Sequence, residues 1–188
     1  MACKFIQRAL ATCAGPLLAA LHLLLPAPPA QGQTQGQTVP EYELKAAFVF
    51  NFAVFTEWPQ DALPGGSALT ICAYTGNSLL PALGALNDKL VHGHKIALRQ
   101  LAAPASLRGC QILFLDSLDR ERWVWLRKEA AGASVLTVSD DRTLGADGMA
   151  ITLSVENRHI GFDVSLAAAR LARLNLSSKL LRLARSVQ

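Results

Sequence analysis

Short apolar runs separated by helical segments constrain the fold of this chain more than any other feature. Residues 68–74 (ALTICAY), 110–116 (CQILFLD) and 133–140 (ASVLTVSD) are each long enough only for a strand. Unbroken apolar strands are typical of a sheet that is covered on both faces. A fourth strand is predicted at 95–101, after a turn at Gly93.

Helical signals fill the segments between these strands. The helix predicted over 77–89 has Asn77 or Ser78 as its cap, and the helix predicted over 117–132 has Ser117. Strands that alternate with helices predict an α/β domain with a central, mostly parallel β-sheet flanked by helices.

The C-terminal third of the domain departs from this alternation. Residues 141–148 read as a loop, and residues 149–164 read as two strands of an antiparallel hairpin. Residues 165–184 read as two short terminal helices that are divided near Asn175, with Ser177 as the cap of the second. The hairpin and the two helices complete the expected fold class.

The first residues have the pattern of a secretory signal peptide. Lys4 and Arg8 precede an apolar run that ends in prolines before a polar stretch. The run is shorter than the roughly 20 apolar residues of a membrane anchor, so we expect the segment to be cleaved. The expected cleavage site follows Gly32, with Ala30 as the alternative. The expected parts are a cleaved signal peptide, a flexible leader and one domain, at 1–32, 33–40 and 41–188.

Charge and cysteine content limit the class of partner. Loss of Lys4 and Arg8 would reduce the formal net charge from +4 to +2, too little to favour nucleic acid or an anionic membrane surface. The first two of the four cysteines would leave with the signal peptide, so the exported domain keeps one pair, Cys72 and Cys110.

The most apolar segment of the domain is a predicted helix over about 41–57, which includes FVFNFAVFTEWP at 48–59. The segment is apolar on nearly every side, whereas a surface helix normally has a wide polar face. Phe48, Phe52 and Phe55 are spaced as one stripe, and we expect this stripe to pack on the sheet.

The remaining sides of this helix need a cover of their own, because they expose more apolar surface than a lone helix should. The C-terminal helices, a partner or a second subunit are the alternatives. The apolar residues on these sides are Ala46, Val49, Phe50 and Ala53.

In the helix at 117–132, Trp125 lies on a different face from Trp123. It belongs either to an interface or to the exposed side of an ordinary amphipathic helix. The candidate interface residues are Phe50, Asn51, Trp58 and Trp125.

The sequence contains no pattern of a catalytic, cofactor-binding or metal site. His92 and His94 lack a third ligand at a recognisable spacing, so a turn with two solvated histidines is favoured over a metal site. Asp116 ends a strand as in receiver domains, but the acidic pair that would hold magnesium is missing, which favours a role at the next helix start. Lys179 follows two serines without the S-x-x-K spacing of serine–lysine catalysis. We expect no enzymatic activity.

Several motifs together resemble the YfiR-like family of periplasmic proteins. They are ELKAAFVFNFAVFTEWP, TICAY, GCQILFLD, VLTVSD, GMAITLSVENRHIGFDVSLAAAR and LNLSSKLLRLA, and they span about 41–185 in order. The resemblance implies an α/β domain that is often dimeric. It also implies an exported repressor, which holds the periplasmic sensor domain of a membrane-bound diguanylate cyclase inactive until envelope or redox stress relieves that hold.

The resemblance bears on three further residues. It implies a disulfide between Cys72 and Cys110, where family members carry one, and two reduced, buried cysteines are the alternative. Gly161 departs from the family, which commonly has a larger residue in this strand. We expect Gly161 to loosen the strand edge.

Two classes of function remain. The first is a periplasmic, non-enzymatic regulator that binds an inner-membrane diguanylate cyclase or sensor kinase and lowers cyclic-di-GMP. By resemblance to the family, a homodimer is among its expected states. The second is a periplasmic small-ligand receptor, because parallel sheets bind ligands beyond the carboxyl ends of their strands. The loops expected at that end are 74–78, 115–119 and 138–142.

Overall fold

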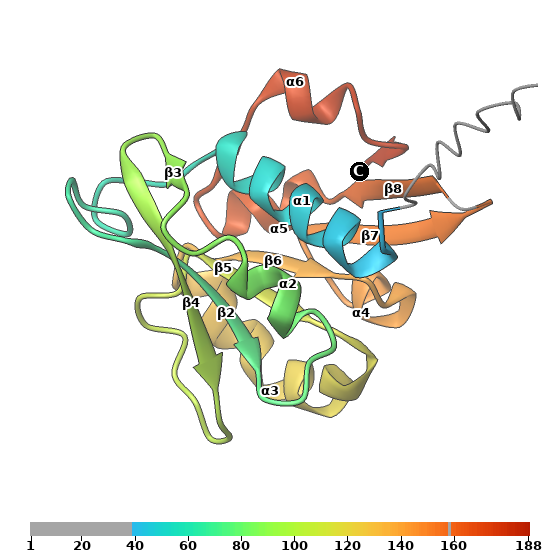
Figure 1. Cartoon of the computed structure of the whole chain (residues 1–188), viewed down its shortest axis with the longest axis horizontal. Helices are drawn as coiled ribbons and strands as arrows, with labels where there is room; N and C mark the ends of the chain where they lie inside the picture. The colour runs from blue at the N-terminus through green and yellow to red at the C-terminus, as the bar shows by residue number, and fades with distance from the viewer. Residues whose placement is uncertain (1–38, 158) are drawn as a thin grey trace, which may run out of the picture. The chain divides into compact units, whose positions relative to one another are not determined.

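Parallel strands form the centre of the protein, whose computed structural model describes residues 39–157 and 159–188 (Figure 1). An eight-stranded sheet has the order β10-β8-β7-β6-β5-β2-β4-β3. The strands from β7 to β4 in this order run parallel. They are β2 (Leu69–Tyr74), β4 (His94–Leu101), β5 (Ile112–Leu115), β6 (Leu136–Ser139) and β7 (Ile151–Glu156). The predicted signal peptide, and the leader up to residue 38, lie outside the described residues.

Short and antiparallel strands complete the two edges of the sheet. β8 (His159–Val164) returns against β7 as the predicted hairpin, and β10 (Ser186–Val187) joins β8 in parallel. At the other edge, β3 (Leu90–Val91) pairs antiparallel with β4. The predicted α/β class, with its mostly parallel sheet and C-terminal hairpin, is confirmed.

Helices cover both faces of this sheet, as its apolar strands require. Successive side chains of a strand point to opposite faces, so Phe114 joins one buried cluster while Leu113 and Leu115 join the other. α1 and α2 contribute to the first cluster, and α3 and α4 contribute to the second; Figure 1 shows α1 and α3 on opposite sides of the sheet. The helices are α1 (Glu41–Val54), α2 (Leu80–Gly84), η1 (Ser117–Asp119), α3 (Arg120–Gly132), α4 (Arg142–Ala146), α5 (Leu166–Leu171) and α6 (Ser178–Leu181).

Helix α1 ends at Val54, earlier than predicted. The next residues form β1 (Thr56–Glu57), which pairs antiparallel with β9 (Asn175–Leu176) of the C-terminal segment. Thr56 Oγ1 donates to the carbonyl oxygen of Phe52 at 2.7 Å and so satisfies an acceptor of the last helical turn. A tertiary pairing therefore decides where this helix stops.

The buried face of α1 also differs from the predicted one. Its buried residues are Ala46, Val49, Phe52 and Ala53. Of the predicted phenylalanine stripe only Phe52 is fully buried, whereas Phe48 and Phe55 are half-buried at one flank. The expectation that Val49 and the two alanines face away from the sheet is wrong, because small side chains at these positions allow the helix to pack closely on the sheet.

The cap of the helical segment after β5 is Asp116, not the predicted Ser117. The Asp116 carboxylate accepts from the Leu118 N–H at 2.9 Å, and Asp119 accepts from the Asp116 N–H at 3.1 Å. The two carboxylates thus satisfy backbone donors reciprocally, as in a capping box. The expectation that Asp116 belongs to the helix start is confirmed.

Three other boundaries were predicted with mixed success. The segment 77–89 is helical only in α2, and Asn77 accepts from a turn N–H before the helix instead of capping it. The predicted loop at 141–148 contains α4, which Asp141 caps. The predicted cap of the last helix, Ser177, is confirmed.

Gly161 does not leave a gap at the strand edge, contrary to expectation. A Cβ atom at this position would lie 2.5 Å from Cδ of Arg185, so the glycine makes room for that side chain. Arg185 then pairs with Glu156 and Asp163, at 2.6 Å in each case. The arginine holds the C-terminal segment against β8 and closes this edge.

Cys72 and Cys110 form a disulfide, with an S–S distance of 2.01 Å and a Cα–Cα distance of 5.8 Å. Cys72 lies in β2, Cys110 lies just before β5, and both side chains are buried. The bridge ties two neighbouring strands across the segment that contains α2, β3 and β4.

Replacing Cys72 and Cys110 together by alanine should lower the free energy of unfolding by about 4 kcal/mol. The chain-entropy model gives this value for a loop of this size, since the cysteines are 38 residues apart in sequence. Urea denaturation of the oxidised protein and of the double variant measures the difference. Equal midpoints and slopes would contradict the prediction.

Gly145→Ala should also destabilise the fold, by about 1–3 kcal/mol, because it overpacks a close contact. A Cβ atom there would lie 2.4 Å from Thr152 Oγ1, where α4 rests on β7. Gly132→Ala is the matched control, since no atom lies within 4 Å of its added Cβ. Thermal denaturation of both variants tests the contact, and a Gly145→Ala variant as stable as Gly132→Ala would refute it.

Candidate interaction surface

The side of α1 that faces away from the sheet is almost free of charge. Leu44, Ala47 and Asn51 are exposed along its centre, and no charged residue other than Lys45 occurs from Leu44 to Thr56. Lys45 is turned toward the carboxyl end of β6, where its Nζ lies 2.8 Å from Asp140. An outward helix face without charge is unusual for a helix in water.

Lys45 is held in place rather than offered to solvent. Its Nζ also lies 2.7 Å from Glu41 in the first turn of the helix. Burial lowers the pKa of Lys45, but the hydrogen bonds to Asp140 and Glu41 outweigh this effect and leave the pKa raised. The ammonium therefore anchors α1 to the loop after β6 and adds no free charge to the outward face.

Two apolar hollows flank the outward ridge of α1. One lies against α2, has a volume of about 390 Å³ and is lined by Phe50 and Ala47 among others. The other lies against the α6 region, has a volume of about 260 Å³ and is lined by Phe48, Asn51 and Phe55. We call Leu44, Ala47, Phe48, Phe50, Asn51 and Phe55 the α1 surface.

The C-terminal segment covers only one flank of this surface. Leu180 of α6 is buried in the core beneath the flank, whereas Leu183 lines the second hollow and is 68% exposed. The pairing of β9 with β1 fixes this segment next to the end of α1. The C-terminal helices thus cover the helix in part, and the ridge between the two hollows stays open in the described chain.

The four predicted interface residues do not form one surface. Phe50 and Asn51 lie on the α1 surface, and the Phe50 ring is half-buried, with Lys89 Nζ 5.6 Å from its centroid. Trp58 is half-buried and its Nε1 donates to the carbonyl of Gln111 at 3.2 Å, so it joins a loop to the start of β5. Trp125 is 82% exposed on α3, on the opposite side of the sheet.

The loops at the carboxyl ends of the parallel strands meet, as expected for a ligand receptor. Asp116 of one loop accepts from the Ser78 N–H of another at 3.3 Å. Arg120 Nε donates to Asp141 at 3.1 Å across a third. The hydrogen bond from Arg120 holds the pKa of Asp141 below its ordinary value despite partial burial. These acidic groups cap helices and bind neighbouring loops, so the chain itself occupies their hydrogen-bonding capacity.

The two histidines of the β3–β4 turn have separate partners. His92 Nε2 lies 2.7 Å from the carbonyl oxygen of Val54, and His94 Nδ1 lies 2.8 Å from that of Ser67. Within residues 39–157 and 159–188, no group of three or more His, Cys, Asp or Glu side chains could hold a metal ion. The same part of the chain has no helix with the length and apolarity to cross a bilayer.

Sequence reasoning missed the outward positions Leu44 and Ala47 because it assigned the wrong face of α1 to the sheet. The usable signal was the spacing of Ala46, Val49 and Ala53, which matches a helix that packs closely. With that face inward, Leu44 and Ala47 must point outward with Asn51.

Comparison with known proteins places the chain in a family. No curated protein matches it. The crystal structure of a conserved domain protein from Vibrio cholerae O1 biovar El Tor strain N16961 shares the fold, with a TM-score of 0.50 at 10% sequence identity. The match covers 80% of this chain but only 61% of the Vibrio chain. The family model described as YfiR/HmsC-like matches residues 42–185. As the sequence motifs predicted, this chain belongs to the YfiR/HmsC-like family.

Proposed function

We propose that this protein is an exported, non-enzymatic regulator that works in the periplasm. It binds the periplasmic sensor domain of an inner-membrane diguanylate cyclase and keeps cyclic-di-GMP synthesis low. Membership of the YfiR/HmsC-like family, which is regulatory rather than catalytic, supports the class of function. The α1 surface supports the mode of action, which is binding to another protein.

The composition of the α1 surface is the observation that carries this proposal. The outward ridge combines exposed Leu44 and Ala47 with half-buried phenylalanines on both flanks. Cores of protein interfaces are depleted in charge and enriched in aromatic residues. A helix of 14 residues is about 21 Å long, which suits the centre of an interface of standard size.

Repression requires a difference in affinity between two states of the partner. A protein that bound the inactive and active sensor domains equally well would not change the equilibrium between these two states. We propose that the α1 surface fits the inactive sensor domain more tightly. A shift of the partner from mostly active to mostly inactive needs a preference of several kcal/mol, which an apolar helix face of this kind can supply.

Deletion of the gene should raise cellular cyclic-di-GMP and surface attachment, because the cyclase loses its repressor. Mass spectrometry of nucleotide extracts and a crystal-violet attachment assay measure the two quantities. Complementation with the full chain should restore both. Unchanged cyclic-di-GMP in a deletion strain with an intact cyclase would reject the proposed function.

Asn51→Arg should abolish complementation while the protein stays folded. Asn51 is exposed on the α1 surface and lines the second hollow, so an arginine there adds a charge to the proposed interface without entering the core. We expect capture of the partner from solubilised membranes to weaken at least tenfold. Phe50 is a less suitable position, because its ring also packs against the core.

Trp125→Ser is the matched control on the opposite side of the sheet. Its side chain is 82% exposed, so the variant should remain folded, and it should retain full repression and partner capture. Circular dichroism melting curves establish that both variants are as stable as the parent. Loss of repression in Trp125→Ser with retention in Asn51→Arg would place the interface on α3 and overturn the assignment.

A further inference from the structure

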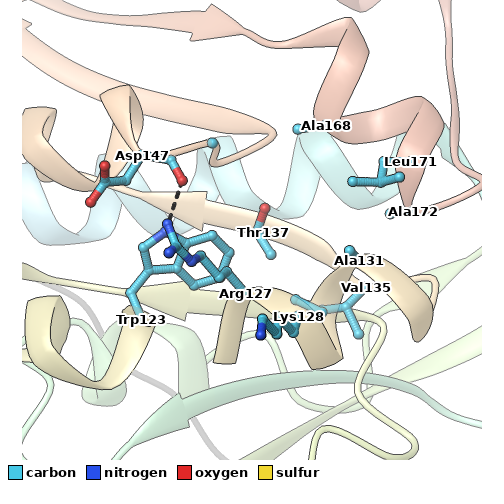
Figure 2. A pocket seen from close by; sticks show the side chains of 12 residues that line it. Trp123, Arg127, Lys128, Ala131, Val135, Thr137, Asp147, Ala168, Leu171 and Ala172 are labelled. Atoms are coloured by element: carbon cyan, nitrogen blue, oxygen red, sulfur yellow. Dashed lines mark hydrogen bonds between the residues drawn. The ribbon is translucent and has the colours of Figure 1, made fainter. Parts of the chain in front are cut away.

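A mainly apolar groove lies between α3 and α5 (Figure 2). Its volume is about 460 Å³, within the range of small-molecule sites. It lies on the α3 side of the molecule, away from the α1 surface and from the loops at the carboxyl ends of the strands. Neither the family nor the proposed regulatory function assigns a role to it.

Small and apolar side chains form the walls of this groove. Ala130 and Val135 are buried at its base, and Ala168, Leu171 and Ala172 of the α5 side face them. Alanines on both sides leave the space that larger residues would fill. Leu171 is 67% exposed, so part of the α5 wall is apolar surface in contact with solvent.

The indole of Trp123 closes one end of the groove. It is 3% exposed, and its Nε1 donates to the carbonyl oxygen of Asp147 at 3.1 Å, so its orientation is fixed. Figure 2 shows this hydrogen bond and the Asp147 carboxylate, which points away from Thr137 and Leu171. The single acid of the lining therefore does not face the interior of the groove.

Two cations line the α3 rim of the groove. Arg127 and Lys128 are exposed on α3, and neither forms an ion pair with a carboxylate of the described residues. Nearby on α3, by contrast, Arg120 and Arg122 are both paired, with Asp141 and Asp119. The groove thus joins an apolar cleft to two cations that are free to bind an anion.

A buried hydroxyl adds a polar group to the floor. Thr137 is 5% exposed, and its Oγ1 accepts from the Ala150 N–H at 2.9 Å. The Thr137 hydroxyl donates no hydrogen bond to another described residue. Figure 2 shows Thr137 between Trp123 and the α5 wall.

We propose that the α3–α5 groove binds an amphipathic carboxylic acid of the medium-chain fatty acid class. The hydrocarbon tail of the ligand lies against Ala168, Leu171 and Ala172, and its carboxylate binds Arg127 and Lys128 through charge-assisted hydrogen bonds. Walls that are mainly apolar disfavour a compact polar anion such as phosphate. This site goes beyond the proposed regulatory function and does not depend on it.

Titration of octanoate into the purified protein, expressed from the full chain, tests the proposal. Isothermal titration calorimetry should show saturable binding, and the neutral analogue octanamide should bind about tenfold more weakly, because it lacks the charge. In a nitrogen-edited NMR spectrum, the Trp123 indole N–H should shift and the Trp58 indole N–H should not. Absence of saturable binding at millimolar octanoate would overturn the proposal.

Three variants separate the charge and the shape of the site. Arg127→Gln with Lys128→Gln should weaken octanoate about tenfold and leave octanamide unchanged. Ala168→Leu should fill the groove and weaken both ligands. The matched control, Lys179→Gln with Arg182→Gln, removes the same charge from exposed positions at α6 and should change neither. Equal loss in the α3 and α6 charge variants, or octanoate binding that survives Ala168→Leu, would show that the site lies elsewhere.

Discussion

Burial of the central strands on both faces is the constraint on which the rest of the structure depends. β2, β5 and β6 expose almost nothing to water, so helices must cover the sheet on each side. One buried cluster forms under α1 and α2, and the other under α3 and α4. The Cys72–Cys110 bridge joins two of these strands within the second cluster and so adds a covalent tie to the same layer.

The same constraint gives α1 two different faces. Alanines and Val49 bring one face close to the sheet, while the opposite face carries little charge beyond Glu43 in the first turn and has phenylalanines at both flanks. The C-terminal segment supports this arrangement from the side, through β9 beside β1 and through Arg185, which crosses Gly161 to reach Glu156 and Asp163. What remains open on α1 is a ridge suited to another protein.

The two surfaces to which we assign binding roles lie on opposite sides of the sheet. The α1 surface is mainly apolar and lies between two hollows, whereas the α3–α5 groove has cations at its rim. The carboxyl ends of the parallel strands, where α/β proteins commonly bind ligands, are taken up by helix caps and by the pair of Arg120 with Asp141. For this reason we assign binding to the helices and not to the strand ends.

The sequence by itself determined the α/β class, the central strands, the hairpin and the Ser177 cap, because apolar runs and local caps are encoded by neighbouring residues. The resemblance of its motifs also indicated the family. Only the tertiary structure decided the inward face of α1, since the helix is apolar on nearly every side and the phenylalanine stripe competes with the spacing of Ala46, Val49 and Ala53. It also decided that Trp58 holds a loop through Gln111, and that Gly161 accommodates Arg185. Those contacts join residues far apart in the chain, and no local pattern records which distant side chain will fill a given space.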